Sequence, residues 1–133
     1  MPTPAVPCPC GLPATYRECC GRFHSGERQA PTAELLMRSR FSAFAVGDTA
    51  YLLRSWHPST RPAQLELDPA QRWERLDILA TERGGVLETR GAVEFRAYYR
   101  EGRHTGSLHE HSDFSREGGA WVYVGPLSPV EFD

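Results

Sequence analysis

The sequence predicts an α+β fold, in which helices in the first half of the chain pack on one face of a curved antiparallel sheet. Apolar residues recur at helical spacing between residues 32 and 56, and from residue 76 onward apolar and polar residues alternate. Helices followed by a run of strands are typical of this class. All four cysteines precede both patterns, within residues 8–20, which indicates a separate small N-terminal element.

Length and composition fit one domain with a small appendage. The chain has 133 residues, of which 40% are hydrophobic, and a formal net charge of −2. This charge gives no overall reason to bind nucleic acid or an anionic membrane. The N-terminus has neither the basic nor the apolar region of a signal peptide, and no stretch approaches the roughly 20 apolar residues of a membrane span. We therefore expect a cytoplasmic protein without membrane or nucleic-acid partners.

The cysteines are spaced as ligands of a metal ion. Cys8 and Cys10 flank one proline, and Cys19 and Cys20 follow after eight residues. Zinc takes four ligands at tetrahedral corners and prefers thiolates and imidazoles in structural sites, so we expect four thiolate ligands. His24 in place of Cys20 is the alternative set. A vicinal disulfide between Cys19 and Cys20 would be strained, and the C-x-x-C spacing of redox sites is absent.

The stretch C-P-C-G, eight intervening residues up to the second pair, and C-C-G resembles the SEC-C motif, a small zinc-binding element. The resemblance implies zinc as cofactor and the same four cysteines as ligands. It also implies a protein partner, because such elements often serve protein contacts. Arg17, Arg22 and His24 would then form a small basic face, although such residues are more often simply solvated.

Two helices are expected next, followed by a third. Thr32 is a suitable N-cap for a helix that Gly47 ends, and Asp48 is a suitable N-cap for a short second helix that the prolines of residues 57–62 stop. The apolar stripe of the first helix consists of Leu36, Met37, Phe41, Phe44 and Ala45. Residues 68–76, with an aspartate cap and proline at the first position, predict the third helix.

The second half of the chain predicts an antiparallel meander. Four strands are expected, at residues 76–82, 86–99, 107–115 and 120–127, with turns between them. The segments TAELLMRSRFSAF, YLLRSWHPSTRP, VEFRAYYREG and LHEHSDFSREGGAWVYV resemble the YchJ family of bacterial proteins. That resemblance implies a cone-shaped fold like that of nuclear transport factor two over residues 28–133, after a SEC-C-like element over residues 1–27.

A cone of this kind holds a pocket between the helices and the concave face of the sheet. Leu108 and Phe114 belong inside, so Glu110 and Ser112 are expected to point inward with them. Trp56, His57 and Arg61 are expected at the pocket mouth. Glu110 then acts as an acid or base assisted by His57 or Arg61, or else forms a structural ion pair with Arg61 or Arg40.

Two classes of function follow from these features. A recognisable metal-binding element and the lack of a compact catalytic set favour a protein-interaction or adaptor module over an enzyme. The alternative is a small-molecule-binding protein or enzyme that uses the cone pocket. A homodimer formed through exposed sheet faces is compatible with either class.

Overall fold

The computed structural model describes residues 6–133, so residues 1–5, which belong to the expected N-terminal element and to the segment lacking signal-peptide features, lie outside it. The elements, in chain order, are α1 (Cys20–His24), α2 (Ala33–Val46), α3 (Thr49–Arg54), β1 (Gln71–Arg83), β2 (Arg90–Glu101), β3 (His104–Glu117), β4 (Ala120–Pro126) and β5 (Glu131–Phe132). In the described part of the chain, no helix combines the length and apolar character needed to cross a membrane.

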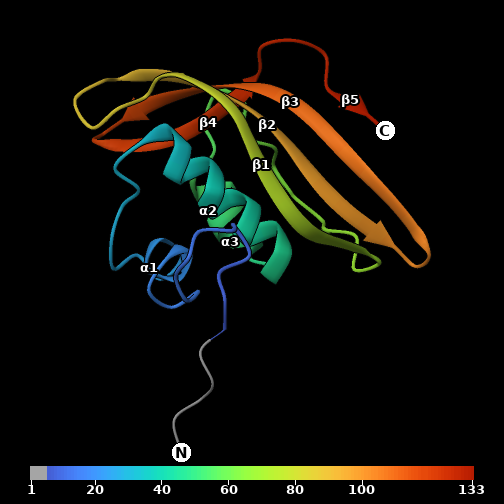
Figure 1. Ribbon diagram of the computed structural model, residues 1–133. Coiled ribbons are helices and arrows are strands. Elements are labelled where there is room, and N and C mark those ends of the chain that lie inside the picture. The colour runs from blue at the N-terminus through green and yellow to red at the C-terminus, as the bar shows by residue number, and fades with distance from the viewer. Residues whose placement is uncertain (1–5) are drawn as a thin grey trace, which may run out of the picture.

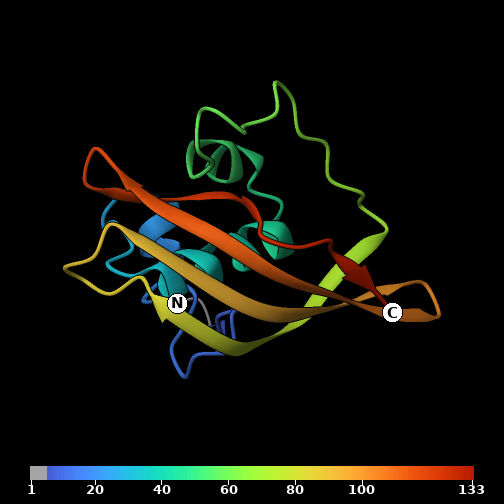
Figure 2. The same ribbon diagram turned by 90° about the horizontal axis from the view of Figure 1, so that it is seen from above.

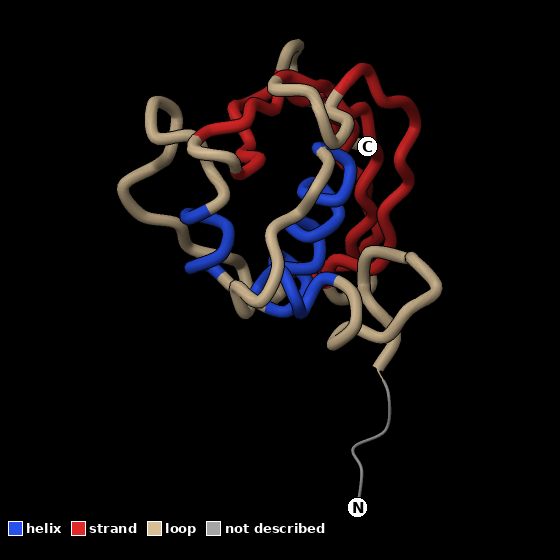
Figure 3. The backbone as a smooth tube through the Cα atoms, turned by 90° about the vertical axis from the view of Figure 1, so that its left-hand side faces the viewer, coloured by secondary structure: helices blue, strands red, loops and turns tan. Residues whose placement is uncertain are grey.

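The strands form one antiparallel sheet that curves over the helices. Their order is β1-β2-β3-β4, and β5 pairs with β3 beyond the end of β4. In Figure 1, α2 runs beneath the sheet, and α1 with the N-terminal segment lies on the side of α2 away from the strands. Figure 2 shows the strands crossing above the helices, and Figure 3 shows them as a curved wall beside the helices. The predicted α+β architecture is confirmed.

The helices α2 and α3 begin at the predicted N-cap residues, and α2 ends at the predicted glycine. The Leu35 N–H donates to Thr32 Oγ1 over 3.1 Å at the start of α2. Gly47 ends this helix with a φ of 80°, a left-handed conformation that glycine adopts without a Cβ clash. The Tyr51 N–H donates to Asp48 Oδ1 over 3.0 Å at the start of α3. Both N-caps are therefore confirmed.

The predicted helix at residues 68–76 is wrong, because β1 covers Gln71–Arg83. Asp68 makes a turn that precedes the strand, in which its Oδ1 accepts from the Ala70 N–H at 2.9 Å. A bulge between Trp73 and Arg75 adds one residue to the strand, so Trp73 and Leu76 both face the helices although three positions separate them. That spacing imitates the period of a helix.

Other strand boundaries also differ from expectation. The strand β2 starts at Arg90 rather than residue 86, since residues 86–89 belong to the turn after β1. The short strand β5 was not expected; it pairs Phe132 with Leu108 on β3. Val93, Phe95 and Ala97 are buried, so these alternate residues form the inward face of β2.

Residues 55–57 cover the outer edge of β4 after the chain leaves α3. The His57 N–H donates to the Tyr123 carbonyl at 2.8 Å, and the Tyr123 N–H donates to the Ser55 carbonyl at 2.8 Å. This pairing fixes Trp56, whose ring meets the Tyr123 ring edge-on at 5.3 Å between centroids. The segment therefore closes one end of the space between α2 and the sheet.

We predict that Thr32→Ala lowers the free energy of unfolding by about 1 kcal/mol, because the Leu35 N–H loses its cap acceptor. Urea denaturation measures the change. Thr89→Ala is the control, since Thr89 is exposed in a turn, and we expect it to change stability by less than about 0.5 kcal/mol. Equal effects of the two substitutions would contradict the capping role.

Candidate metal centre and cone cavity

The four cysteine sulfur atoms lie together in a buried cluster. The Sγ atoms of Cys8, Cys10, Cys19 and Cys20 are all within 4.8 Å of one another, and all four residues are buried. The Sγ atoms of Cys10 and Cys19 are 3.7 Å apart. Zinc–sulfur bonds of about 2.3 Å in a regular tetrahedron place sulfur atoms ~3.8 Å apart. The cluster therefore fits a tetrahedral metal ion with little adjustment.

Short backbone hydrogen bonds bring the two cysteine pairs together. The Cys8 N–H donates to the Ala14 carbonyl at 3.0 Å, and the Tyr16 N–H donates to the Val6 carbonyl at 2.7 Å. The loop thus folds back before α1 begins at Cys20. A Cβ at Gly21 would lie 2.7 Å from the Tyr16 carbonyl oxygen, so this close approach needs glycine.

The thiols strongly influence one another's ionisation. Hydrogen bonds from Cys10 and Cys20 hold the pKa of Cys8 well below its usual range. Burial, together with the charge of Cys10, raises the pKa of Cys19 to about 12. Hydrogen bonding with Cys10 and Cys8 raises the pKa of Cys20. Thiolates packed this closely repel each other, and a bound cation would remove the penalty for ionising all four.

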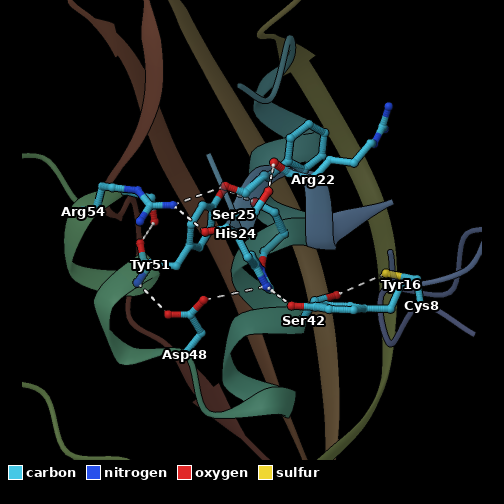
Figure 4. Close-up of polar contacts among 12 residues, drawn as sticks. Cys8, Tyr16, Arg22, His24, Ser25, Ser42, Asp48, Tyr51 and Arg54 are labelled. Carbon is cyan, nitrogen blue, oxygen red and sulfur yellow. Dashed lines mark hydrogen bonds and ion pairs between the residues drawn. The ribbon is translucent and has the colours of Figure 1, made fainter. Parts of the chain in front are cut away.

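The cluster is docked against α2 by polar contacts. The Sγ of Cys8 lies 3.6 Å from Ser42 Oγ, and Arg38 Nη1 donates to the Cys10 carbonyl at 2.8 Å. Figure 4 shows Cys8 and Ser42 facing each other between the N-terminal segment and α2. A metal ion at the cluster would therefore help to hold the segment on this helix, although the ligands themselves come from the segment alone.

His24 is a structural residue of the same interface. Its Nε2 donates to the Ser39 carbonyl at 2.7 Å, so Nδ1 of the neutral ring accepts from the Tyr16 hydroxyl at 2.6 Å. The side chain is only 4% exposed, and its ring lies 4.6 Å from the ring of Tyr51. Both nitrogens are thus occupied outside the cluster. The expected basic face therefore does not include His24.

A second feature is a cavity between α2 and the sheet, with a volume of about 210 Å³. Its walls are mainly apolar and aromatic, with a few polar groups. The lining residues are Met37, Arg40, Phe41, Phe44, Trp56, Trp73, Phe95, Ala97, Leu108, Glu110 and Tyr123. The predicted Trp56 and Glu110 are among them. A pocket between helices and the concave sheet face is thus where the sequence places it.

The other pocket candidates lie outside this lining. His57 Nε2 lies 3.1 Å from Glu117 Oε1, and Arg61 donates to the Trp56 carbonyl through Nη2 at 2.8 Å. Ser112 is fully buried and donates to the Glu110 carboxylate. Neither His57 nor Arg61 is therefore placed to assist Glu110.

Hydroxyl groups hold the Glu110 carboxylate in place of the expected arginine. Its Oε2 accepts from Ser112 and from the Tyr123 hydroxyl, the latter at 2.6 Å, and none of the ion pairs among residues 6–133 includes Glu110. Arg40 donates through Nη1 to the Leu52 carbonyl at 2.8 Å and to Ser55 at 2.7 Å. Burial lowers the pKa of Arg40 to about 10, so the guanidinium remains charged at neutral pH.

Of the two aromatic residues around Arg40, Trp56 was part of the predicted site and Tyr123 was not. The Cζ of Arg40 lies 4.8 Å from the Trp56 ring centroid and 4.6 Å from that of Tyr123. Burial, with a smaller contribution from Glu110, raises the pKa of Tyr123. An arginine within an otherwise apolar helix stripe was the available sequence signal for a buried cation.

Comparison with known proteins identifies both parts. Residues 32–126 match the family model described as YchJ, middle NTF2-like domain. A UPF0225 protein of Streptomyces coelicolor is 60% identical over 124 residues, covering 93% of this chain and 95% of the relative. A UPF0225 protein of Corynebacterium glutamicum is 56% identical over 116 residues, covering 87% of this chain and 92% of the relative.

Two solved structures share the fold. The solution structure of a SEC-C motif containing protein from Rhodopseudomonas palustris has a TM-score of 0.76 and 32% identity, and the match covers 93% of this chain and 96% of the other. The crystal structure of a SEC-C motif containing protein from Psychrobacter arcticus has a TM-score of 0.73 and 25% identity, with 93% and 83% covered. The NTF2-like fold and the resemblance to SEC-C proteins are confirmed.

We predict that His24→Ala lowers the free energy of unfolding by about 1–3 kcal/mol, because the Tyr16 hydroxyl and the buried Ser39 carbonyl lose their partner. Chemical denaturation of the purified protein measures the loss. His104→Ala is the matched control, since His104 is exposed at the start of β3, and it should have little effect. If both variants unfold like the unaltered protein, His24 does not hold the interface.

Proposed function

Because this chain belongs to the YchJ family of UPF0225 proteins, with the SEC-C proteins as structural relatives, we propose that it is a zinc-binding protein-interaction module. In this proposal, zinc bound by Cys8, Cys10, Cys19 and Cys20 fastens the N-terminal element, residues 1–27, onto the cone domain of residues 28–133. The convergence of the four sulfur atoms within 4.8 Å carries the proposal.

The choice of zinc rests on the donor set. Four thiolates at tetrahedral spacing suit zinc, which is not redox-active and is common in closed structural sites. The segment around the cluster has little apolar core of its own, since the partly buried apolar residues beside it are Leu12, Ala14 and Tyr16. Small elements of this kind commonly depend on metal binding to fold. A structural role therefore explains the site better than a catalytic one.

The N-terminal element also supports a contact surface for a protein. Arg17 is exposed on this element and Arg28 is exposed directly after it, while the Arg22 guanidinium lies over the Phe23 ring at 5.3 Å. His24 is inside the interface and contributes nothing to this surface. Exposed arginines on a fixed scaffold suit an acidic segment of a partner protein.

An enzyme that uses Glu110 as an acid or base finds less support. General acid–base catalysis requires a proton donor or acceptor in reach of the substrate, with neighbours that tune it. Glu110 is held by two neutral hydroxyls, and both His57 and Arg61 bond elsewhere. The cavity thus has one carboxylate without the assisting group that the sequence suggested.

We predict one zinc ion per chain in protein purified from zinc-supplemented cells, measured by elemental mass spectrometry. Cys19→Ser should lose the metal, because a hydroxyl replaces one thiolate of the cluster. His24→Ala should retain it, because both ring nitrogens bond outside the cluster. Metal-free unaltered protein would refute the proposal, and loss of zinc from His24→Ala would assign that residue to the ligand set.

For the contact surface, we predict that R17E/R28E abolishes retention of a partner from a lysate of the source organism, because the substituted surface repels acidic groups. The control is Arg103→Glu, which changes an exposed arginine in the turn between β2 and β3. Quantitative mass spectrometry compares the retained proteins. The surface is not used if the same proteins are retained by all three forms.

A further inference from the structure

We propose that the cavity under α2 binds a small neutral molecule of the phenol class, with one apolar ring and one hydroxyl group. This inference goes beyond the proposed interaction function and does not depend on the metal centre. It rests on three observations: the cavity volume, the aromatic lining, and two oppositely charged side chains that line the cavity without forming an ion pair.

Size restricts the ligand to about one ring. The cavity has a volume of about 210 Å³. An apolar protein cavity of ~150 Å³ holds benzene, and pockets for drug-sized ligands start near ~300 Å³. The rings of Phe41, Phe44 and Trp73 line the space, and the Trp73 ring already packs on those of Phe41 and Phe44 at 6.3 and 6.1 Å between centroids. A substituted single ring would fill the space and add to this aromatic packing.

The Glu110 carboxylate provides a hydrogen-bond acceptor. Both hydrogen bonds that it receives from residues 6–133, from Ser112 and Tyr123, end on Oε2. The other oxygen, Oε1, therefore has its full accepting capacity left. Glu110 is buried and lines the cavity. A hydroxyl group on the ligand could therefore donate a hydrogen bond to Oε1.

Arg40 and Trp56 provide donors on the facing wall. The hydrogen bonds of the Arg40 guanidinium to Leu52 and Ser55 use Nη1, and they fix its plane between two aromatic rings. Trp56 Nε1 is the single buried side-chain nitrogen or oxygen within residues 6–133 that has no hydrogen-bond partner. Native proteins rarely leave such a donor unsatisfied, and Trp56 lines the cavity, so a ligand oxygen that reaches this nitrogen would satisfy an unused donor.

Charge selects a neutral ligand. Arg40 and Glu110 carry opposite charges on the same cavity, and they form no direct ion pair. A carboxylate ligand would face Glu110, and an ammonium ligand would face Arg40, so either would be buried beside a like charge. A hydroxyl group donates to Glu110 and accepts from the guanidinium or the indole, and it satisfies both sides without adding charge.

The test titrates p-cresol into the folded full chain and follows the tryptophan indole resonances by ¹H–¹⁵N NMR. We expect a saturable shift of the Trp56 signal, which Trp56→Phe assigns by removing it. The Trp121 signal should stay in place, because that indole already donates to the Pro31 carbonyl at 3.2 Å. Toluene has the same ring without the hydroxyl, and benzoate adds a negative charge. Both should bind at least about tenfold more weakly.

Variants decide whether the named groups recognise the hydroxyl. Glu110→Gln should weaken p-cresol binding about tenfold, whereas Glu94→Gln should not change it, because Glu94 bonds His109 at 2.6 Å and is not among the cavity residues. Trp56→Phe, measured by calorimetry, should weaken binding several-fold and decides the question if Glu110→Gln does not fold. The proposal is overturned by an absence of saturable binding, by equal affinity for toluene or benzoate, or by unchanged affinity in both cavity variants.

Discussion

The structure depends on providing hydrogen-bond partners for the polar side chains that α2 buries on more than one side. Ser39 and Ser42 are fully buried and Arg40 is 3% exposed, within a helix whose other face packs on the sheet. Buried polar groups are costly unless they are hydrogen-bonded. The helix α3 and the segment after it supply partners for Arg40, and Tyr51 bonds Ser39 at 2.6 Å. The N-terminal segment supplies the remaining partners, at Ser42 and at the Ser39 carbonyl.

This requirement places the cysteine cluster and the cavity on one helix. Ser39 and Ser42 face the N-terminal segment, while Arg40 turns toward the cavity and the rings of Trp56 and Tyr123. The N-terminal element is therefore integrated with the cone domain, even though its four cysteines all lie within thirteen residues of sequence. A metal that orders this element would also keep the element in place over the side of α2 opposite the sheet.

The sequence predicted what local chemistry determines. The caps at Thr32 and Asp48 and the helix end at Gly47 follow from short-range preferences, and all three are observed. The first part of β1 was misassigned, because a bulge shifts the phase of alternation and the resulting spacing resembles that of a helix. Spacing alone therefore could not distinguish a bulged strand from a short helix in this segment.

The partners of individual side chains could not be predicted, because they come from distant segments. Glu110 on β3 bonds Tyr123 on the neighbouring strand β4 rather than an arginine, and His24 bonds Ser39 on α2. The sequence contained the correct residue types for both pairs, but many hydroxyls and arginines compete for the same roles. Only the folded backbone determines which of them come within hydrogen-bonding distance.

Native-state hydrogen exchange of zinc-loaded and chelator-treated protein tests most directly whether a metal holds the N-terminal segment on α2. The Cys8 and Gly21 amides donate within this segment, at 3.0 and 2.8 Å. We expect both to lose protection when the metal is removed, while the amide of Ala97 in the middle of β2 stays protected. Unchanged protection at Cys8 and Gly21 after complete metal removal would contradict this role.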